Sequence, residues 1–265
     1  MSSMKQMFVG MALLAAFGTA HAYDSVGDTT DNSSYLRVGP TTSTGFHGPA
    51  GAPGVGLGHG ESWYISLQSI SIPGFTLKET VNGVGRYQLL GYAHTPEQSV
   101  DPIDVNFNWG KVNTTGTGAK QVYFGLTTDK NTTETIAFYV GDKENRAVPN
   151  TDTNYAVLAL VVPNGADGTN PQVLSGSLKF DQLAQTLNSV GDLTDGSNNL
   201  AIATSVTGAN FSGTGIYSNA STAATAGVAS GQFFGGGANS GSSAVAGIVD
   251  GSNVFQAAFG GGASN

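Results

Sequence analysis

The sequence predicts an all-β protein with an N-terminal sheet and a C-terminal barrel. Short runs of Val, Ile, Phe and Tyr are separated by Gly, Asn, Asp, Ser and Thr, as is typical of strands joined by turns. The chain has 265 residues, of which 39% are hydrophobic, 39 are Gly and none is Cys. It is therefore long enough to bury one large core or two small ones, and packing has to stabilise it without disulfides.

The first 22 residues have the pattern of a secretory signal peptide. The single charge of Lys5 precedes an apolar stretch over 7–17, and Ala20-His21-Ala22 forms a small-x-small cleavage site. The stretch is shorter than the roughly 20 apolar residues that span a membrane. We expect cleavage before Tyr23. Without a Cys to carry a lipid, the product should be secreted, with no stable membrane anchor.

The N-terminal domain is expected over residues 23–129. Residues 23–60 are rich in turn-forming residues and predict little regular structure apart from a short strand at 35–38. From Glu61 onward, apolar and polar residues alternate with the period of a strand. The expected strands cover 61–71, 75–81, 86–92, 103–109 and 121–126.

The C-terminal domain is expected over residues 130–265. Eight antiparallel strands are enough to close a small barrel that their own side chains fill. Leu183 and Leu187, spaced i, i+4, also predict one short helix over 180–188. The eight expected strands lie at 135–140, 155–162, 173–179, 200–206, 211–217, 227–234, 244–249 and 254–259.

Five segments of this half resemble the C-terminal eight-stranded barrel of transferrin-binding-protein-like surface proteins, which are cargo of the Slam outer-membrane translocon. The segments are AFYVGD at 137–142, NFSGTG at 210–215, GQFFG at 231–235, AGIV at 246–249 and VFQAAFGG at 254–261. With its cleaved signal and no Cys for lipidation, the chain resembles in particular the hemophilin family of secreted hemophores.

This resemblance implies a role in iron acquisition by a Gram-negative bacterium. The protein would bind haem b outside the cell, with hemoglobin as one haem source, and deliver it to a TonB-dependent outer-membrane receptor. The N-terminal β handle domain would hold the haem. The barrel would serve Slam-dependent export through the outer membrane and docking to the receptor.

Haem iron takes its axial ligands from His, Met, Cys or Tyr, and histidine is the leading option here. The chain after residue 22 has only three histidines, His47, His59 and His94, and all lie in the expected N-terminal domain. His59 stands between glycines that let a flat ligand approach the backbone, and His94 follows an expected strand. We expect His59 and His94 as the axial ligands, with His47 as the reserve candidate.

Whether His59 and His94 can lie close together depends on the order of the strands in the sheet. If the strands at 61–71 and 86–93 are antiparallel neighbours, the two histidines lie at the same edge. A strand at 75–81 placed between them would instead separate them. Trp63 and Tyr92 are expected as walls for the porphyrin, and Arg86 as a partner for its propionates.

The charge pattern and motifs argue against other classes of function. There are 10 Lys and Arg against 18 Asp and Glu, with no basic cluster, so nucleic acid is a poor partner. The sequence has no Gly-x-Ser-x-Gly motif and no His in its C-terminal half, so we expect no enzyme. The main alternative is a secreted adhesion or host-interaction protein that binds a protein or glycan surface through the same barrel. A secreted hydrolase ranks third.

Overall fold

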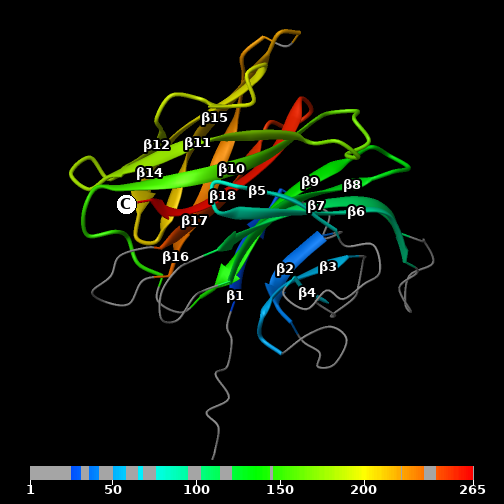
Figure 1. The fold of residues 1–265 in the computed structure, drawn as a ribbon, viewed down its shortest axis with the longest axis horizontal. Helices are drawn as coiled ribbons and strands as arrows, with labels where there is room; N and C mark the ends of the chain where they lie inside the picture. The colour runs from blue at the N-terminus through cyan, green and yellow to red at the C-terminus, as the bar shows by residue number, and fades with distance from the viewer. Residues whose placement is uncertain are drawn as a thin grey trace, which may run out of the picture.

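The structure is a computed structural model, and it describes residues 25–30, 36–41, 50–57, 65–67, 76–94, 103–113, 121–143, 146–221, 223–235 and 243–264. All regular secondary structure in these residues is β (Figure 1), which confirms the predicted all-β class. None of the described residues forms a helix of the length and apolarity that crossing a bilayer requires.

The N-terminal part forms a six-stranded antiparallel sheet in the order β1-β9-β8-β7-β6-β5. Nearly all residues of β8 and β9 are buried, because this sheet lies between two other layers. Its strands are β1 (Ser25–Thr29), β5 (Thr76–Val81), β6 (Val84–His94), β7 (Ile103–Asn113), β8 (Gln121–Asp129) and β9 (Thr135–Asp142).

A small three-stranded sheet covers one face of the six-stranded sheet. It consists of β2 (Leu36–Pro40), β3 (Pro53–Leu57) and β4 (Ile65–Ser66). Leu36, Val55 and Leu67 of this layer are buried against side chains of the larger sheet. Figure 1 shows the small sheet on the side of the six-stranded sheet that faces away from the barrel.

The C-terminal part forms a closed antiparallel barrel. β10 pairs with both β18 and β11, which closes the sheet on itself. β12 and β13 share one position between β11 and β14, so the barrel has eight strand positions, the number that the sequence predicts. Its strands are β10 (Thr153–Pro163), β11 (Gln172–Asp181), β12 (Thr186–Ser189), β13 (Leu193–Thr194), β14 (Asn198–Thr207), β15 (Asn210–Asn219), β16 (Thr225–Phe234), β17 (Ala244–Asp250) and β18 (Phe255–Ser264).

Side chains fill the interior of the barrel. Phe233 is fully buried there, with its ring centroid 5.5 Å from that of Phe180, 5.6 Å from that of Phe211 and 6.1 Å from that of Tyr155. Inward-facing residues of the other strands belong to the same cluster. The barrel is therefore a packed core of the kind expected for eight strands.

Aromatic rings over glycines join the six-stranded sheet to the barrel. A Cβ on Gly260 of β18 would lie 2.5 Å from the ring of Phe124, which belongs to β8. In the reverse direction, a Cβ on Gly141 of β9 would lie 2.6 Å from the ring of Phe234, which belongs to β16. Because each ring needs a partner without a side chain, these glycines set the close approach of the two parts.

Three elements differ from the sequence-based expectations. The strand predicted at 135–140 as the first of the barrel is β9, and it pairs with β8 and β1 in the six-stranded sheet. The short helix predicted over 180–188 is a turn between β11 and β12, because residues 186–189 pair with β14 instead of closing a helical turn. The turn-rich segment 23–60 contains β1 and β3, which neighbouring strands hold in place.

Candidate functional site

Aromatic side chains line the face of the six-stranded sheet that the small sheet covers. The rings of Tyr87 and Trp109 stack at 5.4 Å with an interplanar angle of 16°. Phe107 lies 5.1 Å from Trp109 and stacks on Phe138 at 5.4 Å. We call this surface, formed by Tyr87, Leu89, Phe107, Trp109 and Phe138, the aromatic face. Apart from the half-buried Tyr87, its residues are buried, and they share a core with Leu36, Val55 and Leu67 of the small sheet.

A β-bulge interrupts β6 beside the aromatic face. Leu89 pairs with Phe107, but the next pair is Tyr92 with Val105, so three steps along β6 match two steps along β7. Leu90 and Gly91 therefore both lie opposite Asn106, as in a bulge with one extra residue. Gly91 has a φ of 62°, in the left-handed region that glycine adopts without steric cost.

The side chain of Asn106 contacts this bulge from β7. Its Oδ1 accepts a hydrogen bond from the backbone N–H of Gly91 at 3.0 Å. Its Nδ2 donates to the backbone carbonyl of Asp167 at 2.6 Å and to Thr169 Oγ1 at 3.3 Å. Asp167 and Thr169 belong to the loop between β10 and β11 of the barrel. One buried amide therefore bridges the bulge and the barrel.

Asn108 and Gln88 extend this contact along the same face. Asn108 Nδ2 donates to the carbonyl of Gly168 at 2.8 Å, and Gln88 Nε2 donates to the carbonyl of Thr169 at 2.6 Å and to Asn108 Oδ1 at 3.0 Å. We call Gln88, Asn106 and Asn108 with the carbonyls of residues 167–169 the amide clamp. Buried amides with these partners avoid the cost of an unsatisfied polar group.

Local contacts also hold the loop residues of the amide clamp, 167–169, in place. The backbone N–H of Thr169 donates to Asp167 Oδ1 at 2.8 Å, and this bond holds the pKa of the Asp167 carboxyl below its usual range. Gly168 has a φ of 69°, and a Cβ there would collide with the side chain of Thr128. The loop therefore presents its carbonyls in a fixed geometry.

The sequence-predicted site residues are only partly within the described residues. His47, His59 and Trp63 lie outside them. For Tyr92 and His94 the backbone is described, as the last residues of β6, paired with Val105 and Ile103, while their side chains lie outside the description.

The side chain of Arg86 is described. Its Nε donates to Glu79 Oε1 of the neighbouring strand β5 at 2.7 Å. By strand alternation, Arg86 belongs to the same row as Gln88, on the barrel side of the sheet and opposite Tyr87. Its role toward a propionate stays a prediction.

The strand arrangement that would bring His59 and His94 together by direct pairing is absent from the described residues. β4, at residues 65–66, pairs with β3 in the small sheet, and β6 pairs with β5 and β7. Of the two strand orders that the sequence left open, direct pairing of 61–71 with 86–93 is therefore not found within the described part. His94 ends β6, while His59 lies outside the described residues.

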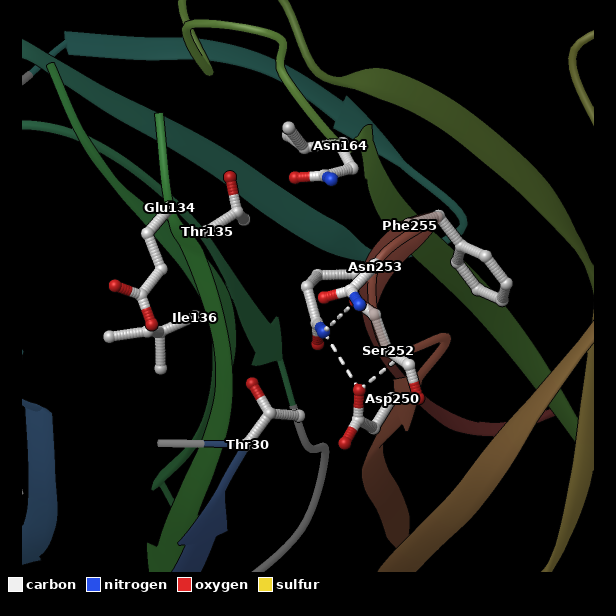
Figure 2. A pocket seen from close by; sticks show the side chains of 11 residues that line it. Thr30, Glu134, Thr135, Ile136, Asn164, Asp250, Ser252, Asn253 and Phe255 are labelled. Atoms are coloured by element: carbon white, nitrogen blue, oxygen red, sulfur yellow. Dashed lines mark hydrogen bonds between the residues drawn. The ribbon is translucent and has the colours of Figure 1, made fainter. Parts of the chain in front are cut away.

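A hollow of about 320 Å³ lies where the six-stranded sheet meets the rim of the barrel. Figure 2 shows Glu134 and Asp250 on opposite sides of it. Asp250 Oδ1 accepts hydrogen bonds from Ser252 N at 2.7 Å and from Gln256 Nε2 at 2.8 Å. With this polar, acidic lining the hollow does not suit an apolar macrocycle. Within the described residues there is also no group of three or more His, Cys, Asp or Glu that would hold a metal ion.

Two tyrosines of the six-stranded sheet are buried and resist ionisation. Burial raises the pKa of Tyr123 well above its usual range, and the nearby charge of Asp142 raises it further. Burial likewise raises the pKa of Tyr139, with a contribution from Asp28. Tyr123 donates its hydroxyl hydrogen to Gln121 Oε1 at 3.1 Å. Both hydroxyls are therefore harder to ionise in the folded protein than in the unfolded chain.

The folded protein should therefore lose stability above about pH 10. Unfolded tyrosines ionise near that pH. Because the folded pKa values are higher, the stabilisation is complete below pH 10 and is lost as the pH rises toward the folded pKa. Each tyrosine should lower the free energy of unfolding by about 1.4 kcal/mol per pH unit in this window. Urea unfolding from about pH 9 to 11.5 should show a flatter pH dependence for Tyr139→Phe than for the wild type. Equal slopes would contradict the assignment.

The amide clamp and the bulge leave only a weak signal in the sequence. In β7, Asn106 and Asn108 alternate with Phe107 and Trp109, a pattern typical of a strand with one solvent-facing side. The structure places these amides against the barrel loop instead. Gly91, within an otherwise strand-forming run, is the local mark of the bulge.

No protein-family model matches the chain. Among solved structures, the chain is similar to the isotype 1 transferrin binding protein B (TbpB) from serogroup B Neisseria meningitidis, with a TM-score of 0.40 and 15% sequence identity. The similarity covers 66% of this chain and 36% of that chain, so the matched part is little more than a third of the length of TbpB.

Proposed function

We propose that this protein is a secreted hemophore, which captures haem b outside the cell and delivers it to a TonB-dependent outer-membrane receptor. His59 and His94 bind the haem iron, and Trp63 and Tyr92 form walls of the site. The barrel serves Slam-dependent export and docking to the receptor. Hemoglobin is one source of the haem.

The observation that carries this proposal is the register of the end of β6. Tyr92 and His94 pair with Val105 and Ile103, which belong to the odd-numbered row of β7. Phe107 and Trp109 of the aromatic face belong to the same row. A residue type that ligates haem iron thus continues the row of buried aromatic residues to the end of the strand, which supports a haem site with apolar walls beside His94.

The packing of the barrel supports a site outside it. The interior is filled by buried side chains such as Phe211, Phe233 and Phe259. A porphyrin inside the barrel would have to displace this core at a cost of many buried contacts. All three histidines after residue 22 belong to the N-terminal part of the chain, which agrees with a site on the six-stranded sheet and the small sheet.

A hemin titration of the full chain tests the function. The protein should give a saturable shift of the Soret band that ends at one equivalent, because a single site with axial histidines holds one haem. The control is the same hemin series in buffer alone. If the spectrum of the protein mixture equals that of the control, the hemophore proposal fails, and the secreted adhesion or host-interaction protein becomes the leading interpretation.

A further inference from the structure

The bulge in β6 decides to which face of the six-stranded sheet the end of this strand belongs. We propose that Asn106 is a positioning residue for the haem site, because it holds the bulge that transfers the positions of Tyr92 and His94 to the row of the aromatic face. This inference rests on the proposed function and adds a residue that contacts neither haem nor iron. Because the side chain of Asn106 donates to a loop of the barrel, the barrel also contributes to the geometry of the site.

The first step is the change of row within β6. Before the bulge, even-numbered residues of β6 pair with even-numbered residues of β7, as in Gln88 with Asn108, and this row faces the barrel. After the bulge, Tyr92 and His94 pair with odd-numbered residues. Directly opposed residues of antiparallel strands belong to the same face. Without the extra residue, both positions would therefore fall on the barrel side.

The second step is the stability of the bulge itself. An extra residue leaves a backbone group without a partner in the strand ladder. Here the N–H of Gly91 finds its acceptor in Asn106 Oδ1 at 3.0 Å. The regular strand register would place no residue in this left-handed conformation. The side chain of Asn106 thus supplies the hydrogen bond that the bulged backbone lacks.

The third step is the fixed orientation of the Asn106 amide. Both of its donor contacts go to the barrel loop, to the carbonyl of Asp167 and to Thr169 Oγ1. A flipped amide would point its NH₂ group at the N–H of Gly91 and its oxygen at the carbonyl of Asp167, so both of these hydrogen bonds would be lost. The loop therefore keeps Oδ1 aimed at the bulge.

The test compares Asn106→Ala with Asn108→Ala in the full-length protein. Asn108 is a matched control because it lies on the same strand and face, is buried, and donates to the adjacent loop carbonyl of Gly168, but does not contact Gly91. Two quantities are measured for both variants and the wild type. The first is the hydrogen-exchange rate of the Gly91 amide without haem, followed by NMR. The second is the ferric haem spectrum with the rate of haem loss.

In Asn106→Ala, the Gly91 amide should exchange at least about tenfold faster than in the wild type, because its acceptor is gone. Haem retention should weaken by about tenfold or more, as is common when a group that orients a metal ligand is removed. The low-spin fraction should also fall. Asn108→Ala should keep the wild-type spectrum and the wild-type exchange rate at Gly91.

Two results would overturn the inference. One is a Gly91 amide that exchanges at the wild-type rate in Asn106→Ala, which would show that the bulge holds without this side chain. The other is a change in haem retention and spin state of equal size in both variants, which would show a general effect of the amide clamp on stability. A wild-type protein that takes up no haem would instead refute the proposed function, and the exchange measurement would still decide whether Asn106 holds the bulge.

Discussion

Replacing either His59 or His94 by Ala should convert the bound ferric haem from six-coordinate low-spin to five-coordinate or water-ligated high-spin. Two axial histidines give the low-spin state, and the loss of one leaves a weaker or vacant sixth position. Each variant should also lose haem faster, while apolar burial of the porphyrin keeps some binding. Absorption spectra of the hemin complexes and haem transfer to an acceptor protein measure both effects.

His47→Ala is the matched control for this experiment, and it should change the spectrum little. His47 precedes β3 in the sequence and His59 follows it, so the two substitutions remove the same residue type from the same turn-rich part of the chain. If His59→Ala keeps an unaltered low-spin spectrum, then His59 is not a ligand. In that case His47 becomes the first candidate.

Replacing Phe233 by Ala should destabilise the barrel more than any exposed substitution. Phe233 is fully buried, with Phe180, Phe211 and Tyr155 around its ring. Truncating a buried Phe to Ala costs about 3–5 kcal/mol, because burial is lost and a cavity remains. Thermal unfolding followed by circular dichroism should show a fall in Tm of roughly 6–20 °C for a chain of this size.

Val228→Ala on β16 provides the comparison, since Val228 is 67% exposed on the outside of the same barrel. Its effect should stay within about 0.5 kcal/mol. If Phe233→Ala unfolds at the same temperature as Val228→Ala, the barrel interior is not the close-packed core described above. A haem site inside the barrel would then have to be reconsidered.

Periodicity in the sequence was sufficient for most strands of both parts. Alternation and turn residues predict strands that overlap β5 to β11 and β14 to β18, because one side of each strand meets a core and turn-forming residues end it. The number of eight strand positions also agrees, although β12 and β13 occupy the position that the sequence assigned to the strand at 135–140. These features depend on the local pattern of apolar, polar and turn-forming residues, which can be read from a single sequence.

The sheet to which a strand belongs could not be predicted from the local sequence. β9 is buried on both faces, so its sequence lacks the alternation that would tie it to one core. Its partners β8 and β1 decide that it belongs to the six-stranded sheet. The turn before β12 similarly replaces a predicted helix because β11 and β14 offer ladder partners to residues 186–189.

By itself, the sequence determined the all-β class, the closed barrel, and three histidines confined to the first 94 residues as the candidates for binding haem iron. Only the tertiary structure decided which face of the sheet the end of β6 joins. That choice depends on one bulge, one glycine at positive φ, and the amide of Asn106 held by a loop some 60 residues further along the chain. Hydrogen bonds between such distant residues produce no periodic pattern in the sequence. Each partner fits its own strand or loop, and many other residues would fit there equally well.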